Sequence, residues 1–289
     1  MITADAYSFL SDMLKKYSGL SLGPGKEYLI ESRLPPVAAQ LGLKDLDALI
    51  AAIRFSSTKA MIKLVCDAMT TNETLFFRDG KPFSALEHEV IPAAAHRARA
   101  QGRPLRIWCA ASSTGQEPYS IAMLIANLER QLNGVRVDIH ATDYSAAAIA
   151  RAKAAVFNQF EVQRGLPINY LIKYFQQVPD GYELIQDVRR RVTFEEINLL
   201  NPYPSHWQFD IIMCRNVLIY FDVATKKDVI DRMARLMVPG GALFLGGTES
   251  TLGITDSVVR VPNQPSGMFC RPGDVTLFAP KLAVAAPAA

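Results

Sequence analysis

Two acidic residues beside predicted strands are the first candidates for chemistry. Residues 105–110 form a short apolar run typical of a buried strand, and a turn of small residues (111–115) leads into a helical pattern that begins at Gln116. Glu117 lies in the first turn of this helix, where a carboxylate repels a phosphate and attracts a cation or a hydroxyl donor. Asp143 follows the next strand-like run, as does the acid that binds ribose hydroxyls in doubly wound folds. Together the two residues indicate a ligand that contains a nucleoside.

A dinucleotide is a weaker interpretation of the same turn. The GxGxxG pattern is absent, because residues 110–115 hold a single glycine, Gly115. Each feature also has a purely structural explanation, since a lone glycine can serve the backbone of the turn and an aspartate after a strand can cap a helix. Only the combination of Gly115, Glu117 and Asp143 supports the nucleoside hypothesis.

Strand-like and helix-like patterns alternate from residue 105 onward, which predicts an α/β domain with a doubly wound parallel sheet. The predicted strands are 105–110, 135–142, 209–214 and 241–247, and the predicted helices are 116–132, 145–154 and 222–237. Segments 182–185 and 191–194, near a Pro-Asp-Gly turn at 179–181, break this rhythm and predict an inserted antiparallel β-subdomain at about 176–197. Ligands bind outside the carboxyl ends of such strands, where residues 197–199, Arg215 and Asn216 join the two acids.

The first part of the chain contains helix-like patterns and almost no strand-like ones. These patterns cover 7–17, 26–41, 46–55 and 58–69, and a further helix is expected over 81–103. The second of them contains Pro35-Pro36, which we expect to break the helix. We therefore predict an all-α N-terminal domain at 1–80 and a second domain at 81–277. Residues 278–289, rich in Ala and Pro, predict a disordered tail.

Composition argues against several classes of protein. The formal net charge is only +3 with charges of both signs interspersed, so nucleic acid is not the expected partner. Four cysteines without a CxxC pair predict reduced, buried thiols and no metal site. The chain has no run of eighteen apolar residues and no signal-peptide pattern, so we expect a cytoplasmic protein without membrane insertion.

Three motifs resemble those of one family. Residues 113–120 read STGQEPYS, residues 72–78 read NETLFFR and match NxTxFFR, and residues 214–221 read CRNVLIYF and match CRNVxIYF. In this order they resemble the CheR family of chemotaxis receptor methyltransferases, and the resemblance covers roughly residues 5 to 272. It implies a Rossmann-like class I methyltransferase domain with an inserted β-subdomain, preceded by a small all-α domain.

The resemblance implies that S-adenosyl-L-methionine is the cofactor. In that family Glu117 would face the methionine end, Asp143 would hold the ribose, and Tyr220 would lie near the transferred methyl group. Arg78 and Tyr220 are the candidates for positioning the substrate, because the planar fork of an arginine suits a carboxylate. The implied cofactor-binding positions are Asn72, Thr74, Arg78, Gly115, Glu117, Asp143, Asn198 and Leu199 (which would frame the adenine), Arg215 and Asn216.

The implied reaction is methyl transfer to glutamate side chains in the cytoplasmic domain of chemoreceptors, which produces methyl esters and S-adenosylhomocysteine in sensory adaptation. A carboxylate is ionised at neutral pH and needs no general base. Two alternatives remain open: a non-catalytic adaptor that binds S-adenosylmethionine, and a methyltransferase acting on another substrate. Residues 201–204 (NPYP) resemble the NPPY of amino-methylating enzymes but precede the 209–214 strand instead of ending it.

Three features depart from the family pattern or bear on partners. Gln116 stands where many members have a second glutamate. The helical domain is nearly charge-balanced, so a basic face that docks receptors would rest on Lys15, Lys16, Arg33, Arg54 and Lys59. The segment 176–185 is shorter and poorer in glycine than in members that bind a receptor C-terminal pentapeptide, so we expect independence of that peptide.

Overall fold

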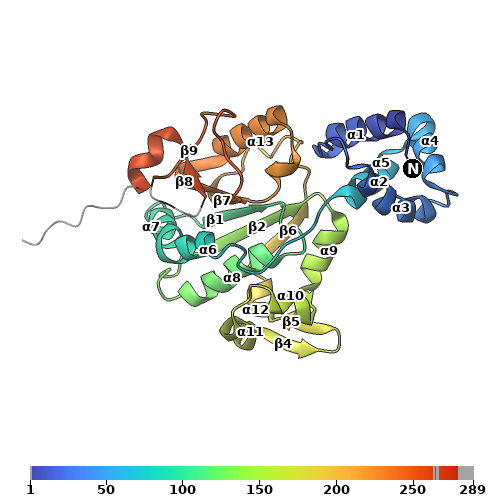
Figure 1. The fold of residues 1–289 in the computed structure, drawn as a ribbon. Coiled ribbons are helices and arrows are strands. Elements are labelled where there is room, and N and C mark those ends of the chain that lie inside the picture. Colours follow the sequence, from blue (N-terminus) through green and yellow to red (C-terminus); the bar gives the residue numbers. More distant parts are fainter. Residues whose placement is uncertain (1, 263, 265–266, 279–289) are drawn as a thin grey trace, which may run out of the picture.

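The predicted strands lie side by side in one seven-stranded sheet of order β6-β2-β1-β7-β8-β10-β9 (Figure 1). The computed structural model describes residues 2–262, 264 and 267–278. Strands β1 (Leu105–Ala110), β2 (Val137–Asp143), β6 (Val192–Glu196), β7 (Phe209–Cys214) and β8 (Met237–Leu245) run parallel, and β10 (Met268–Cys270) and β9 (Val259–Arg260) are added antiparallel at one edge. The chain builds outward from β1 to one side and then returns to β7 on the other. This reversal creates a crevice between β1 and β7 of the kind that binds ligands.

Both faces of the sheet are buried, which explains why its central strands β1 and β7 are apolar apart from Arg106 and Asp210 near their starts. In β1, Ile107 and Cys109 pack on one face and Trp108 and Ala110 on the other, as the two-residue period of a strand requires. The first face is covered by α6 (Lys81–Ala85), the π-helical turn η1 (Leu86–Val90), α7 (Ile91–Ala100), α8 (Gln116–Leu128) and α9 (Ala146–Ala154). The second is covered by α13 (Val223–Leu236). The predicted doubly wound sheet is confirmed.

The N-terminal helices form a unit with its own apolar core at the carboxyl ends of the strands (Figure 1). They are α1 (Ala4–Ser18), α2 (Glu27–Arg33), α3 (Pro35–Gln40), α4 (Leu46–Ser56) and α5 (Lys59–Met69). The helix-like pattern over 26–41 is divided into two helices at the predicted break, Pro35-Pro36. Pro35 cannot donate a backbone hydrogen bond and is tolerated in the first turn of a helix, so α2 ends and α3 begins there.

The inserted subdomain is a three-stranded antiparallel sheet of order β3-β5-β4, built from β3 (Val156–Phe157), β4 (Phe175–Val178) and β5 (Gly181–Leu184). Three short helices accompany it: α10 (Gln159–Gln163), α11 (Ile168–Tyr174) and α12 (Gln186–Arg189). Strand β5 confirms the prediction for 182–185. The segment 191–194 is a strand, as predicted, but its antiparallel pairing in the inserted subdomain is wrong. That segment is β6, which pairs parallel with β2. Its buried Val192 and Phe194 alternate with exposed residues because an edge strand is covered on one face, a pattern that antiparallel strands share.

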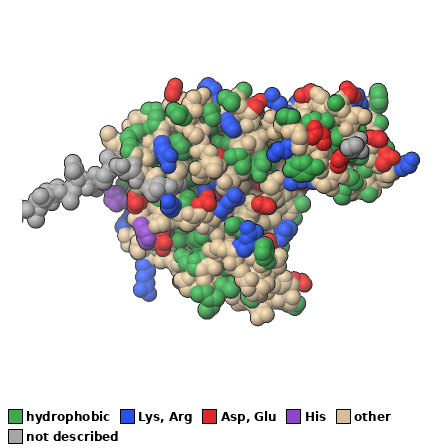
Figure 2. Space-filling model, viewed as in Figure 1, with side chains coloured by type: hydrophobic (Ala, Val, Ile, Leu, Met, Phe, Trp, Pro, Cys, Tyr) green, Lys and Arg blue, Asp and Glu red, His purple; other side chains and the backbone are tan. Residues whose placement is uncertain are grey.

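Several smaller expectations can be compared with the described residues. All four cysteines are buried and free, as predicted. No helix within the described residues is long and apolar enough to cross a membrane. On the face drawn in Figure 2, basic and acidic side chains lie interspersed. Phe278 ends the 3₁₀ segment η3 (Pro272–Phe278), and the rest of the predicted tail, 279–289, lies outside the described residues.

A buried ion pair between Arg103 and Asp210 fixes the opposite end of the sheet. The two nitrogens of Arg103 contact the two oxygens of Asp210 at 2.8 and 2.9 Å, and Asp210 also accepts the Arg106 N–H. The Asp210 side chain is fully buried. We expect Asp210→Ala to lower the free energy of unfolding by about 3 kcal/mol, because it leaves the arginine without its partner.

Denaturant unfolding measures this loss. Asp138→Ala is the matched control, since it breaks an exposed pair with Arg136 and is expected to cost less than about 1 kcal/mol. Equal losses in the two variants would contradict a structural role for the buried pair.

Candidate cofactor-binding site

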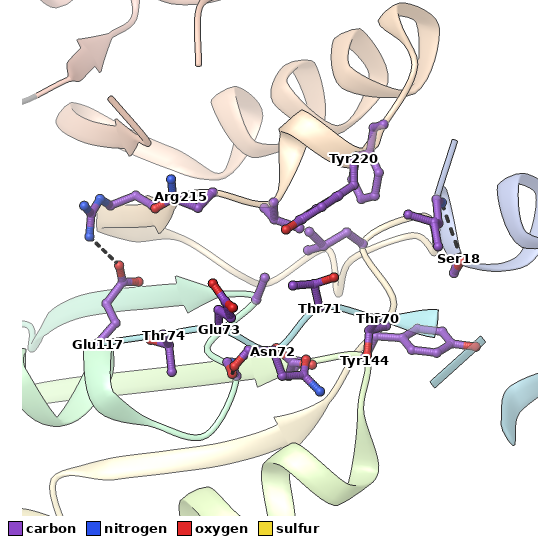
Figure 3. A pocket seen from close by; sticks show the side chains of 18 of the residues that line it. Ser18, Thr70, Thr71, Asn72, Glu73, Thr74, Glu117, Tyr144, Arg215 and Tyr220 are labelled. Atoms are coloured by element: carbon purple, nitrogen blue, oxygen red, sulfur yellow. Dashed lines mark hydrogen bonds and ion pairs between the residues drawn. The ribbon is translucent and has the colours of Figure 1, made fainter. Parts of the chain in front are cut away.

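A pocket of about 980 Å³, including its open mouth, lies at the carboxyl ends of β1, β2, β6 and β7 (Figure 3). The segment 70–75, which joins α5 to the second domain, forms one wall, and the 215–221 segment after β7 forms another. Every predicted site residue except Gly115 lines it. Ile197, expected at this edge of the sheet, also lines it. The lining residues not predicted are Ser18, Leu20, Thr70, Thr71, Glu73, Leu75, Ala111, Ser113, Tyr144, Val217 and Phe221.

The turn between β1 and α8 owes its shape to unusual backbone angles. Ala111, Ser113 and Gly115 all have positive φ (58°, 51° and 97°). A Cβ on Gly115 would lie 3.0 Å from Ala152 Cβ and 3.1 Å from the Tyr119 ring. Gly115 therefore serves the turn and its packing beneath the pocket, and the structure does not place it on the pocket wall.

Asp143 is held rigidly at the end of β2. Its Oδ2 accepts the Ser113 N–H at 2.7 Å and its Oδ1 accepts the Ser145 N–H at 2.9 Å, and burial raises its pKa. The N-cap of α9 is Ser145, whose hydroxyl accepts the Ala148 N–H, so Asp143 is not the helix cap. Each carboxylate oxygen keeps further accepting capacity, which suits a pair of ribose hydroxyls.

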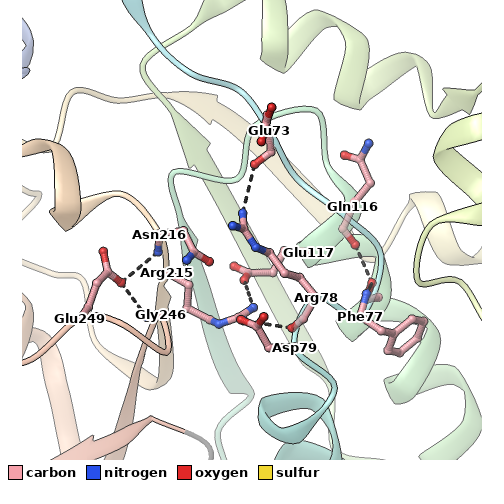
Figure 4. Close-up of polar contacts among 11 residues, drawn as sticks. Glu73, Phe77, Arg78, Asp79, Gln116, Glu117, Arg215, Asn216, Gly246 and Glu249 are labelled. Carbon is pink, nitrogen blue, oxygen red and sulfur yellow. Dashed lines mark hydrogen bonds and ion pairs between the residues drawn. The ribbon is translucent and has the colours of Figure 1, made fainter. Parts of the chain in front are cut away.

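Arg215 joins three parts of the chain beside the pocket (Figure 4). Its Nη1 contacts Glu117 Oε2 at 2.9 Å, and its Nη2 contacts Asp79 Oδ2 at 2.6 Å and donates to the Arg78 carbonyl at 2.9 Å. Its side chain is 1% exposed and that of Glu117 is 13% exposed. Burial raises the pKa of Glu117, and the guanidinium of Arg215 opposes the rise. Arg215 therefore acts by fixing protein groups, and only its buried Nε lacks a hydrogen-bond partner in the described chain.

Arg78 is the other cation on the pocket wall. Its guanidinium donates to the Glu73 carbonyl at 3.3 Å and forms no ion pair within the described residues. An arginine that forms no ion pair with the protein can bind a ligand carboxylate through two parallel N–H···O hydrogen bonds.

The helical unit closes the far side of the pocket. Asn198 Nδ2 donates to the Tyr17 carbonyl at 2.7 Å, the Ser21 N–H donates to the Tyr220 carbonyl at 2.8 Å, and Lys15 pairs with Asp222 at 2.7 Å. The amide of Asn198 is thus engaged with the helical unit.

Some of the lining residues that were not predicted lie near a sequence motif, and others do not. Thr71 and Tyr144 adjoin predicted site residues, Thr70 lies two residues before Asn72, and Val217 and Phe221 lie inside the 214–221 motif. Ser18 and Leu20 lie far from every motif, and only the packing of the helical unit against the sheet brings them to the pocket.

The fold and the pocket define a class I methyltransferase that uses a nucleoside cofactor. Residues 72–265 match the family model "CheR methyltransferase, SAM binding domain", and residues 5–70 match "CheR methyltransferase, all-alpha domain". The chain belongs to the CheR methyltransferase family, and its cofactor is S-adenosylmethionine.

Curated relatives agree over nearly the whole chain. A "Chemotaxis protein methyltransferase" of Vibrio parahaemolyticus is 40% identical over 271 residues, which are 93% of this chain and 97% of that protein. "Chemotaxis protein methyltransferase 1" of Pseudomonas aeruginosa is 40% identical over 260 residues, 89% of this chain and 94% of that protein. Enzymatic methyl transfer follows for this chain.

The chemistry of the pocket fits this cofactor. Carboxylates at Glu117 and Asp143 suit its cationic and hydroxyl groups, and the guanidinium of Arg78 suits its carboxylate. We expect Arg78→Ala and Asp143→Asn each to weaken binding of S-adenosylhomocysteine by about 10- to 100-fold, since each removes a charge-assisted hydrogen bond.

Isothermal titration calorimetry measures the affinity, and circular dichroism checks the fold. Asp138→Asn, at the other end of β2, is the control and should leave the affinity unchanged. Unchanged affinity in both site variants would refute these two assignments.

Proposed function

We propose that this enzyme transfers the methyl group of S-adenosylmethionine to side-chain carboxylates of glutamates in the cytoplasmic domain of chemoreceptors. The products are glutamate methyl esters and S-adenosylhomocysteine, and the enzyme acts in the cytoplasm in sensory adaptation. The family membership and the names of the relatives support the pathway. One observation about the pocket supports the acceptor: its described lining contains no histidine, cysteine or lysine, while Arg78 has no ion pair there.

A carboxylate acceptor explains this lining. Glutamate has a pKa near 4.3 in water, so at neutral pH it is already a nucleophile and needs no base. An amine or hydroxyl acceptor would need a group to take its proton. The lining offers an arginine to attract a carboxylate, and its two buried carboxylates, Glu117 and Asp143, are assigned to the cofactor and not to an acceptor proton.

The roles of the chain's own residues follow from their places on the wall. S-adenosylmethionine, when bound, supplies an electrophilic methyl group on a sulfonium sulfur. Glu117 complements the positive charge at the methionine end, and Arg78 donates N–H groups to a carboxylate. Tyr220 faces Thr71 and Asn72 across the pocket (Figure 3) and is placed to orient the acceptor. Orientation and exclusion of water are worth up to roughly 7–11 kcal/mol in favourable systems.

No observation favours the amino-methylating alternative. The 201–204 segment does not line the pocket. Instead, the Tyr203 hydroxyl donates to the Leu199 carbonyl at 3.0 Å, and its ring packs edge-on against Trp108 with centroids 5.0 Å apart. The resemblance to NPPY is thus explained by packing beneath the Leu199 turn.

We expect radiolabelled methyl transfer from S-adenosylmethionine to membranes that contain chemoreceptors. The label should be released by mild base, because an ester hydrolyses where a methylated nitrogen does not. Base-stable label would mean another acceptor, and cofactor binding without transfer would mean an adaptor. The Arg78→Ala variant is the negative control.

Partner recognition is part of the proposal. Strands β4 and β5 are joined by only two residues, Pro179 and Asp180, which supports independence of a receptor C-terminal pentapeptide. In the helical unit, Lys15 pairs with Asp222, Arg54 pairs with Asp5, and Arg33 donates to backbone carbonyls, so much of the suggested basic patch is engaged within the chain.

We therefore expect titration of the enzyme with a receptor C-terminal pentapeptide to give no measurable heat. Methylation rates should be equal for receptors with and without those five residues. Binding of the peptide, or a rate that depends on it, would contradict this expectation.

A further inference from the structure

We infer that Glu249 is a positioning residue for methyl transfer, acting through the turn that carries Asn216 and Tyr220. This inference rests on the proposed function, because it assigns Glu249 a part in the same reaction. Glu249 does not line the pocket and belongs to none of the three motifs. Its carboxylate ties together the ends of β7 and β8 (Figure 4).

Three backbone N–H groups converge on this carboxylate. Oε2 accepts from Gly246 at 2.6 Å and from Asn216 at 2.9 Å, and Oε1 accepts from Ile219 at 3.2 Å. The Glu249 N–H donates in turn to the Gly246 carbonyl at 2.9 Å. Both oxygens are therefore used to fix backbone, and two of the three donors lie in the turn after β7.

The turn after β7, residues 215–221, depends on the hydrogen bonds that Glu249 accepts. Asn216 has a φ of 60°, a strained value for a residue with a side chain, and residues 218–220 form only a single 3₁₀ turn. Ile219 lies within this turn, and its N–H finds its acceptor in Glu249. The same turn places Asn216 and Tyr220 on the pocket wall.

The approach is close enough to require glycine at position 246. A Cβ there would lie 2.8 Å from Glu249 Oε2 and 2.9 Å from the Asn216 nitrogen. Further along the same loop, Asp231 on α13 accepts from the hydroxyls of Thr255 and Ser257. The loop that carries Glu249 is thus anchored on both sides.

Two substitutions separate the effect of the charge of Glu249 from the effect of its side-chain length. The charge of Glu249 adds to the rise that burial causes in the pKa of Glu117, so loss of charge alone could alter the site. Glu249→Asp keeps the charge but is one methylene too short to reach both groups of donors. Glu249→Gln keeps the length but turns an NH₂ group toward backbone N–H donors. Asp256→Asn, an exposed change in the same loop, is the matched control.

We expect Glu249→Asp and Glu249→Gln each to lower kcat by about 10- to 100-fold, because small displacements of positioning groups have effects of this size. The calorimetric affinity for S-adenosylhomocysteine should fall by a smaller factor than kcat, since Asn216 lies on the turn that Glu249 fixes but Arg78, Glu117 and Asp143 lie on other elements. Rates are normalised to cofactor-binding sites, which removes any loss of folded protein. Asp256→Asn should match the wild type.

Amide hydrogen exchange gives a readout that does not need the acceptor. In both Glu249 variants the peptide covering 215–221 should exchange at least about tenfold faster, while the peptide covering 105–117 should not change. Unchanged exchange at 215–221 would overturn the inference, as would a wild-type kcat in Glu249→Asp, which would show that charge alone matters. If the wild type methylates no receptor, the proposed function fails and the exchange measurement still decides the role of Glu249.

Discussion

The buried guanidinium of Arg215 is the interaction on which the shape of the pocket depends. It follows β7 in the chain, yet it holds the first turn of α8 through Glu117 and the end of the interdomain segment through Asp79 and the Arg78 carbonyl. With its side chain 1% exposed, its charge is stable only because two carboxylates face it. One guanidinium thus holds together three segments that are far apart in the sequence. Because Arg215 fixes the backbone of Arg78, the side chain of Arg78 faces the pocket.

The sequence predicts the central sheet well because burial on both faces makes strands continuous apolar runs. Strands β1 and β7 have the predicted bounds, 105–110 and 209–214. Prediction fails where burial is one-sided, as in β6, since an edge strand of a parallel sheet has the same alternation as an antiparallel strand. The break at residues 35 and 36, by contrast, can be predicted, because tandem prolines are tolerated only where a new helix begins.

Some residues of the site can be predicted from the sequence, and others cannot. Asp143, Glu117 and Arg78 could be found because each stands at a strand end or in a motif, and all three line the pocket. Gly115 is a predicted cofactor-binding residue, and in the structure it serves the turn between β1 and α8 and does not line the pocket. Asp79 pairs with the guanidinium of Arg215, and Glu249 accepts from the backbone N–H of Asn216. Both partners are distant in the sequence, and no local pattern reveals such contacts.

The pocket wall is drawn from both structural units, and this has a thermodynamic consequence. The direct contacts between the units include the Lys15–Asp222 pair, the Asn198–Tyr17 hydrogen bond and the Ser21–Tyr220 hydrogen bond, each at the protein surface and each of modest strength. A ligand that touches residues 70–75 on one side and β2 and β7 on the other binds the joined arrangement more tightly than the separated one. By linkage it must strengthen the union of the units by the same free energy. Binding of the cofactor therefore stabilises the contact between the two units. The fraction of molecules in which the units are joined rises with the concentration of the cofactor.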